Sequence, residues 1–202
     1  MPIFEKNNCK ILYINTPKTG GTSIAQHFVD CGWDIFYHNR LSNIVVEKIN
    51  NSLYHNCMQH FDYKLLNEYG IIDGEYDFIF MTCRHPFNRF VSEWCAKYLD
   101  YNQKRFGGEI EKGKIINFLE NEVSLSFRFD YHFQRQIDYY GERVEFIKRQ
   151  ESGDWGKLYN FIDVENIPFI NRGRTAYFLK QFEFVRSEIE KIYEEDIRFF
   201  NY

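Results

Sequence analysis

The sequence predicts an α/β protein with a parallel central sheet flanked by helices. Short runs of strand-forming residues alternate with segments in which apolar residues recur at helical spacing, a pattern typical of a mainly parallel sheet. Two of these runs lead directly, through a turn containing Gly or Pro, into a helical segment. Ligands bind beyond the carboxyl ends of the strands in such sheets, so these two turns are the first candidates for a functional site.

The chain properties predict one folded domain over residues 1–202. Hydrophobic residues make up 44% and charged residues 27% of the chain, and no repeat, low-complexity segment or linker divides it. The net charge of −4 argues against a broad nucleic-acid surface, so we expect any anion site to be local.

Cysteine usage and hydropathy predict a cytoplasmic protein. The five cysteines are an odd number without C-x-x-C spacing, which favours a reducing compartment. No apolar run has the length of a signal peptide core or approaches the roughly 18 residues that a membrane span needs. The sequence does not indicate the oligomeric state.

The first strand-to-helix unit contains the stretch "ILYINTPKTGGTSIAQHF". We predict a short strand over Lys10 to Asn15, a turn over Thr16 to Gly21 and a helix from about Thr22. The predicted apolar face of this helix comprises Ile24, Ala25, Phe28 and Val29.

The turn "TPKTGGTS" predicts an anion site. Gly20 and Gly21 let the backbone approach an anion closely, and the N–H groups that open the helix point toward it. Lys18 precedes the glycines, whereas the lysine of a P-loop follows them. Because Lys18 approaches from the strand side, it would contact the oxygen atom that links a bound phosphate to the group attached to it. Lys18 could therefore stabilise negative charge on that oxygen when the attached group leaves. Further hydroxyl donors are Thr19, Thr22 and Ser23.

The second unit begins with "YDFIFMTC", a nearly continuous apolar run typical of a central strand buried on both faces. After the turn "RHP", Pro86 suits the first helical position. Arg84 lies at the carboxyl end of the strand and Ser92 about two turns into the helix, a suitable receptor for a second phosphate. The predicted helix face comprises Phe87, Phe90, Val91, Trp94 and Tyr98.

The C-terminal third predicts three further elements. "VEFIKR" is typical of a strand, "DWGKLYNFI" of a helix that Asp154 would cap, and "FVRSEIEKIYEEDIRFF" of an amphipathic helix with Glu194 and Arg198 paired across one turn. The charged, glycine-containing stretch from Tyr101 to Lys114 is a candidate lid.

These motifs carry a family resemblance. "PKTGGTS" resembles the 5′-phosphosulfate-binding motif of sulfotransferases that use 3′-phosphoadenosine-5′-phosphosulfate (PAPS), and "CRHPFNRFVSEW" is similar to their 3′-phosphate-binding motif. Other segments resemble the carbohydrate-type branch of the family: "MQHFDY", "VEFIKRQESGDW", "NRGR" and "IYEEDIRFFNY".

The resemblance implies a P-loop nucleotide-kinase-like sulfotransferase fold with a five-stranded parallel sheet, and in-line sulfuryl transfer from PAPS without a metal. Arg84 and Ser92 would bind the 3′-phosphate, and Arg172 and Arg174 of "NRGR" are further candidate contacts for the nucleotide. The 5′-phosphosulfate would be bound by Lys18, Thr19, Gly20, Gly21, Thr22 and Ser23.

Sulfuryl transfer to a hydroxyl also needs a base, and a neutral imidazole can serve near pH 7. His60 lies in the segment that resembles the base-bearing region of the family, and His55 is the alternative. His55 and His132 are candidate acceptor-binding residues, whereas His85 is expected to shape its turn.

Competing interpretations remain for some of these residues. His55, Cys57 and His60 in "HNCMQH" resemble a partial zinc site, although no second ligand pair is evident and we expect no metal. For Glu93, a helix-surface position or structural pairing is favoured over an acid role, and Glu151 is unassigned.

The predicted function is sulfuryl transfer to a hydroxyl, most simply of a carbohydrate. The alternatives are a nucleotide or small-molecule kinase, a catalytically inactive nucleotide-binding relative, and a sulfotransferase for a tyrosine or lipid acceptor.

Overall fold

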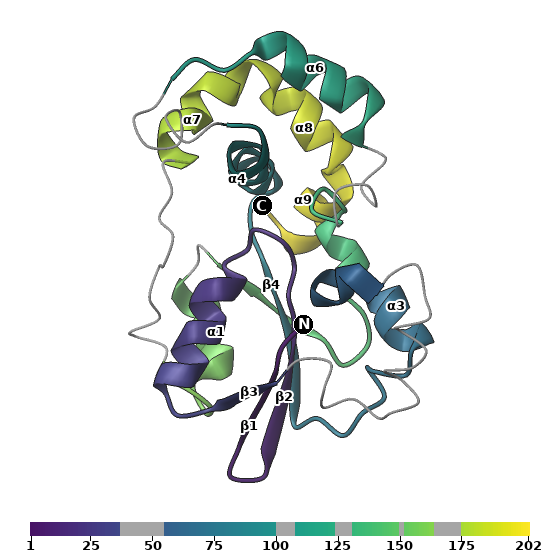
Figure 1. The fold of residues 1–202 in the computed structure, drawn as a ribbon, viewed down its shortest axis with the longest axis vertical. Helices are drawn as coiled ribbons and strands as arrows, with labels where there is room; N and C mark the ends of the chain where they lie inside the picture. Colours follow the sequence, from purple (N-terminus) through teal and green to yellow (C-terminus); the bar gives the residue numbers. More distant parts are fainter. Residues whose placement is uncertain (37–54, 100–107, 124–130, 150–151, 164–174) are drawn as a thin grey trace.

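The computed structural model describes residues 1–36, 55–99, 108–123, 131–149, 152–163 and 175–202, with side chains at 55–57, 152, 153, 175 and 176 left outside the description. Its centre is a five-stranded sheet in the order β3-β1-β2-β4-β5 (Figure 1). The strands are β1 (Ile3–Lys6), β2 (Cys9–Ile14), β3 (Asp34–Phe36), β4 (Phe78–Cys83) and β5 (Glu145–Lys148). The expected α/β class, a central sheet flanked by helices, is confirmed.

The expectation of a fully parallel sheet is wrong for one strand. β2, β4 and β5 pair in parallel, but β1 runs antiparallel to both β2 and β3. β1 and β2 form a hairpin whose two turn residues, Asn7 and Asn8, have φ angles of 50° and 64°. Two left-handed residues in succession are typical of the turn that joins adjacent antiparallel strands, and Asn tolerates this conformation better than most residues.

Each face of the sheet carries its own apolar cluster because successive residues of a strand point to opposite sides. On one face, Ile11 and Tyr13 of β2 pack with α1 (Gly21–Asp30) and the 3₁₀ helix η5 (Ser152–Leu158). On the other face, Leu12 and Ile14 pack with residues of the helices on that side. These are α3 (Tyr63–Glu68), the 3₁₀ helix η4 (Gln136–Tyr139) and α9 (Glu194–Phe200).

A separate layer of helices lies beyond the end of β4 (Figure 1). It has its own core, in which Phe90 and Trp94 of α4 contact Phe118 and Phe182. The layer comprises α4 (Pro86–Tyr98), α6 (Lys112–Asn121), α7 (Thr175–Phe182) and α8 (Arg186–Ile192). Pro86 takes the first position of α4, as predicted. The candidate site is therefore enclosed between the strand ends and this helical layer.

The predicted C-terminal helix over 184–200 is interrupted. A 3₁₀ turn, η6 (Glu183–Val185), precedes α8, and Tyr193 separates α8 from α9. Tyr193 is buried and its hydroxyl donates to the carbonyl oxygen of Phe133 at 2.6 Å. Beyond this break, Glu194 and Arg198 form the predicted ion pair at 3.1 Å.

Two smaller expectations also need correction, and a third is left untested. Asp154 lies within η5 (Ser152–Leu158) and not at its start, and its Oδ2 accepts a hydrogen bond from the backbone N–H of Lys148 in β5 at 2.9 Å. Val29 is 42% exposed, and His27 takes the buried position on α1 instead. Within the candidate lid, residues 101–107 lie outside the described part, and α6 begins at Lys112.

The described part of the chain shows two further properties. The four cysteines whose side chains are described, Cys9, Cys31, Cys83 and Cys95, are free thiols. None of its helices is long and apolar enough to cross a membrane.

A buried polar clamp fixes the end of β4 against the C-terminal helix. The Gln136 side chain accepts from the backbone N–H of Arg84 at 2.9 Å and donates to the carbonyl of Arg84 at 2.8 Å. Asp196 of α9 accepts from the backbone N–H groups of Gln136 at 2.8 Å and Ile137 at 2.9 Å. Gln136 and Asp196 are both fully buried, so these bonds form away from water.

Asp196→Asn should destabilise the fold, because its amide NH₂ would face one of two backbone N–H donors and leave that donor unpaired. We expect a loss of about 1–3 kcal/mol in the free energy of unfolding, measured by urea denaturation. Burial raises the pKa of Asp196 despite the charge of Arg89 and the hydrogen bonds from Gln136 and Ile137, which means that its charged form is costly to bury. The neutral Asn side chain avoids this cost and so offsets part of the loss. Glu194→Gln on the exposed face of α9 should cost about 0.5 kcal/mol or less. Equal losses for the two variants would contradict an anchoring role for Asp196.

Candidate functional site

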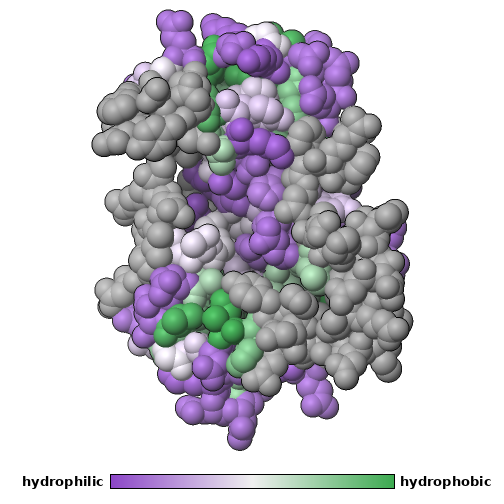
Figure 2. Space-filling model, in the orientation of Figure 1, coloured by the Kyte–Doolittle hydropathy of each residue, from purple (hydrophilic) through white to green (hydrophobic). Residues whose placement is uncertain are grey.

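A cavity of about 280 Å³ opens where the first turn meets the helical layer. Hydrophilic residues gather at mid-height on the face shown in Figure 2, between the sheet region and the helical layer. The described residues that line the cavity are Asn15, Lys18, Gly20, Gly21, Thr22, Ser23, Gln59, His60, Ser92, His132 and Arg149. The structure thus brings together the first predicted turn, Ser92 from the helix of the second predicted unit, and the candidate histidines His60 and His132.

The backbone of the first turn is left-handed at Lys18 and Gly20, with φ angles of 62° and 105°. This conformation is ordinary for Gly but costs free energy for Lys, and such residues are concentrated at functional sites. The left-handed step at Gly20 immediately precedes α1, whose first N–H groups have no partner within the helix. The turn therefore presents backbone donors and the Lys18 side chain to the same cavity.

A chain of buried hydroxyl groups supports this turn from below. Thr19 donates to the carbonyl oxygen of Thr16 at 2.7 Å, and its Oγ1 lies 2.7 Å from Oγ1 of Thr82. Thr82 in turn lies 2.7 Å from the Tyr13 hydroxyl, whose pKa burial raises to about 12. Because the proton of Thr19 is committed to a carbonyl, the chain runs from Tyr13 through Thr82 to Thr19. The Thr19 hydroxyl, predicted to contact the donor, is thus directed into the interior, while Thr22 and Ser23 line the cavity.

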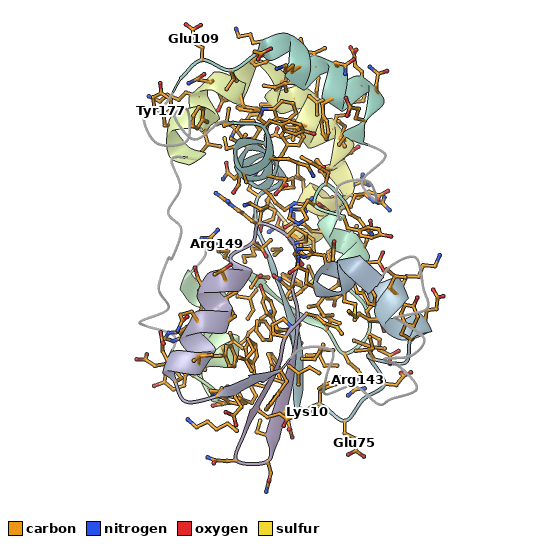
Figure 3. The ribbon with its side chains drawn as sticks, in the orientation of Figure 1. Lys10, Glu75, Glu109, Arg143, Arg149 and Tyr177 are labelled. Atoms are coloured by element: carbon orange, nitrogen blue, oxygen red, sulfur yellow. The ribbon has the colours of Figure 1, made fainter. Side chains whose placement is uncertain are left out.

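Both glycines of the turn are closely approached by side chains. A Cβ on Gly21 would lie 2.0 Å from Oδ1 of Asn15, and one on Gly20 would lie 2.9 Å from Nε of Arg149. Figure 3 shows Arg149 near the N-terminal end of α1. A side chain at Gly21 would have to displace Asn15, and one at Gly20 would have to displace Arg149. Glycine is favoured at Gly20 chiefly by its positive φ.

Two arginines follow neighbouring parallel strands at this edge of the sheet. The backbone N–H of Arg149 donates to the carbonyl oxygen of Cys83 at 2.9 Å, which places Arg149 beside Arg84. Burial, with the nearby charge of Arg149, lowers the pKa of Arg84 to about 10, and burial also lowers the pKa of Arg149. The Nε of Arg84 is buried without a hydrogen-bond partner among the described residues. This arrangement favours an anion, although Arg84, unlike Ser92, is not among the described residues that line the cavity.

His60 ends the 3₁₀ helix η2 (His55–His60) and is only 7% exposed. Its Nδ1 lies 3.0 Å from the backbone carbonyl oxygen of Asn15. A carbonyl can only accept, so Nδ1 carries the proton and the lone pair of neutral His60 is on Nε2. The local structure therefore selects the tautomer in which Nε2 is the basic nitrogen.

His132 contacts both His60 and a buried carboxylate. The His60 and His132 rings meet edge to face, with centroids 4.6 Å apart and planes at 85°. Nδ1 of His132 lies 2.8 Å from Oε2 of Glu93, which is 4% exposed. Burial acts to raise the pKa of Glu93, but the hydrogen bond and charge of His132, with the charges of Lys18 and Lys97, hold it below its usual value. Glu93 is therefore buried and paired with His132, and the expectation of a helix-surface position is wrong.

Several predicted residues lie elsewhere. His85 precedes α4 and is 3.9 Å from Glu190, away from the residues that line the cavity. The described residues contain no group of three or more His, Cys, Asp or Glu side chains that could hold a metal ion. Outside the described part lie Arg172, Arg174 and Glu151, together with the side chains of His55 and Cys57.

Three residues of the site were missed by the sequence analysis: Asn15, Gln59 and Arg149. Asn15 and Arg149 each directly follow a parallel strand, the same signal that identified Arg84. Gln59 offered no such signal, because only the approach of η2 to the turn brings it to the cavity.

A mostly parallel sheet with a polar cavity at the carboxyl ends of its strands is typical of proteins that bind an anionic group. The model of the sulfotransferase family matches residues 2–202, and the chain therefore belongs to this family. It is accordingly an enzyme that transfers a sulfuryl group, and members of this family generally take that group from PAPS. Comparisons with curated proteins and with solved structures gave no match.

Gly21→Ala should weaken nucleotide binding, because the new methyl group would displace the Asn15 side chain and shift the turn. Overpacking of this kind costs about 1–3 kcal/mol, so the affinity for adenosine 3′,5′-bisphosphate should fall roughly tenfold or more by calorimetry. Gly113→Ala in α6 is a matched control, since an added Cβ there meets no atom within 4 Å. That variant should bind normally and gain up to about 1 kcal/mol of stability. Unchanged binding by Gly21→Ala would show that the turn tolerates a side chain.

Proposed function

We propose that this enzyme transfers the sulfuryl group of PAPS to a hydroxyl group of a carbohydrate. The observation that carries the proposal is the single cavity in which the glycine turn, Lys18 and Ser92 face two histidines. It offers anion-binding groups on one side and an imidazole base on the other, as direct transfer between two bound substrates requires.

On the donor side, Lys18 and the backbone N–H groups of the turn would bind the 5′-phosphosulfate. Lys18 stabilises the negative charge that grows on the departing phosphate oxygen, an interaction that strengthens toward the transition state. Thr22 and Ser23 line the cavity beside it. Ser92 and Arg84 would bind the 3′-phosphate. Burial and the charge of Arg149 lower the pKa of Arg84, so its charged guanidinium would be stabilised by a nearby anion such as this phosphate. Arg149 joins this set because its side chain lies against Gly20 and lines the cavity.

On the acceptor side, His60 would accept the proton of the hydroxyl group. The acceptor oxygen bonds to sulfur while the bond between sulfur and the phosphate oxygen breaks, and the hydroxyl proton passes to Nε2 of His60. The contact with the carbonyl of Asn15 supports this role, because it leaves the lone pair of neutral His60 on Nε2.

The chemistry of the cavity wall favours a carbohydrate over a tyrosine or lipid acceptor. No residue with an aliphatic or phenyl side chain is among the described residues that line the cavity. Asn15, Gln59, Ser92 and His132 instead offer hydrogen-bonding groups, which match the hydroxyl groups of a sugar. A lipid chain or a phenol ring would require an apolar wall.

A transfer assay with a panel of acceptors tests the proposal. The enzyme should transfer sulfate from PAPS to at least one saccharide and should show less activity with tyrosine peptides and lipid hydroxyls. Adenosine 3′,5′-bisphosphate should raise the melting temperature more than ATP with magnesium does. Binding without transfer to any acceptor would contradict the proposed reaction, and transfer only to peptides would contradict the proposed acceptor class.

Substitutions of Lys18 and His60 should separate the two sides of the reaction. Lys18→Ala should lower kcat roughly a hundredfold or more with a smaller loss of donor affinity. His60→Ala should lower kcat by about 10²–10⁴-fold, leave nucleotide binding nearly unchanged and remove the acidic limb of the pH–rate profile. Steady-state kinetics and calorimetry measure these effects. A folded His60→Ala enzyme with normal kcat and the same acidic limb would exclude His60 as the base.

A further inference from the structure

Two imidazole rings, those of His60 and His132, contact each other in the cavity. The His60 and His132 rings have centroids 4.6 Å apart, and both rings line the same cavity. Two positive charges at this separation repel strongly where water is partly excluded. The protein should therefore disfavour the state in which both rings are imidazolium.

The polar groups that contact the two rings differ and favour different protonation states. His60 donates from Nδ1 to the carbonyl of Asn15, which a neutral imidazole can do equally well. His132 instead places Nδ1 at 2.8 Å from the carboxylate of Glu93. The Glu93 side chain is only 5% exposed, and a buried carboxylate is costly unless a cation pairs with it. The contact therefore favours the charged form of His132.

We propose that Glu93 assigns opposite roles to the two histidines, holding His132 as an imidazolium so that neighbouring His60 stays neutral and serves as the base. This inference rests on the proposed sulfuryl transfer. Paired titratable groups whose surroundings favour opposite protonation states commonly divide acid and base roles in active sites. Glu93 is then a positioning residue, since it acts through His132.

The backbone around His132 is held firmly enough to maintain this geometry. Buried Arg89 donates to the carbonyl oxygens of His132, at 3.4 Å, and of Gln134. The Gln134 side chain donates to Asp62 at 2.8 Å, and the Tyr193 hydroxyl donates to the carbonyl of Phe133. His132 is thereby fixed from both the sheet side and the helical layer.

The imidazolium of His132 has a direct use in the reaction. It places positive charge beside the base, where the sulfuryl oxygens and the attacking oxygen would lie, while Lys18 acts on the departing phosphate. Other charged or titratable groups that act on this pair are Lys18 from the first turn, Lys97 and Tyr98 from α4, Arg89 below the His132 backbone and His60 from η2. None of the cations among them replaces the contact between Glu93 and His132 Nδ1.

The pH dependence of transfer tests this division of roles. The wild-type profile should be bell-shaped, with an acidic limb from His60 and a basic limb from loss of the His132 proton. Glu93→Gln keeps the size and a hydrogen-bond acceptor but removes the charge, so its basic limb should move about one pH unit or more toward acid. At a pH above the basic limbs of both the wild-type enzyme and the variant, this shift corresponds to a kcat about tenfold lower in the variant. The acidic limb should stay in place or move slightly.

Glu190→Gln provides a matched control, because Glu190 also faces a histidine, His85, but lies outside the cavity. This variant should reproduce the wild-type profile. A shift of the acidic limb in Glu93→Gln would identify His132 as the base, and unchanged limbs would show that Glu93 has only a structural role. Either result would overturn the proposal. A wild-type enzyme without transfer activity would instead contradict the proposed function.

A measurement on the wild-type protein tests the same point without a variant or a substrate. In ¹⁵N NMR spectra of histidine-labelled protein near pH 7, His132 should show two protonated ring nitrogens. His60 should show a protonated Nδ1 and an unprotonated Nε2. A neutral His132 or a doubly protonated His60 under these conditions would overturn the proposal whether or not the acceptor is known.

Discussion

The geometry of the site depends on how the end of β4 is held. The chain leaves the sheet at Arg84 and enters α4 two residues later, so neither sheet nor helix pairs both backbone groups of Arg84. The Gln136 side chain pairs both of them, and Asp196 pairs the backbone of Gln136 in turn. Buried hydrogen bonds of this kind are costly to break singly, because each leaves an unpaired polar group. One network thereby fixes the strand end, the start of α4 and the segment that carries His132.

The two layers of the protein contribute different chemistry to the cavity. Cations come from the sheet side, where Lys18 and Arg149, which follow the parallel strands β2 and β5, line the cavity. Arg84 follows β4, the strand between them, and lies beside Arg149. The helical layer contributes Ser92 and Glu93 from successive positions of α4. Since these two side chains point in different directions from one helix, Ser92 reaches the cavity while Glu93 contacts His132 beneath its wall. A short stretch of α4 thus serves both the donor side and the acceptor side.

The sequence was sufficient to predict the elements that form the central part of the fold. β4 is a nearly continuous apolar run, β2 contains the apolar run Ile11–Ile14, and β5 is a short segment of strand-forming type. The turns after β2 and β4 contain the residue types that anion binding needs. β1 and β3 were missed because these short segments lack a strong local pattern, and their positions depend on the antiparallel pairing of β1 with β2 and with β3. The break at Tyr193 was missed for a related reason, since it arises from a contact with Phe133, 60 residues away. Of the site, residues on the turns could be predicted from local pattern, whereas the burial of Glu93 follows only from the distant segment around His132.

The two histidines differ in how evolution can alter them. His60 is oriented by the main-chain carbonyl of Asn15, which every amino acid at position 15 would supply. His132 is oriented by the side chain of Glu93, which a single nucleotide change can remove. Mutation at position 15 therefore leaves the carbonyl that orients His60 in place. Mutation at position 93, in contrast, changes the group that orients His132. A lineage of this enzyme could retune its working pH at position 93 while the tautomer of His60 is inherited unchanged.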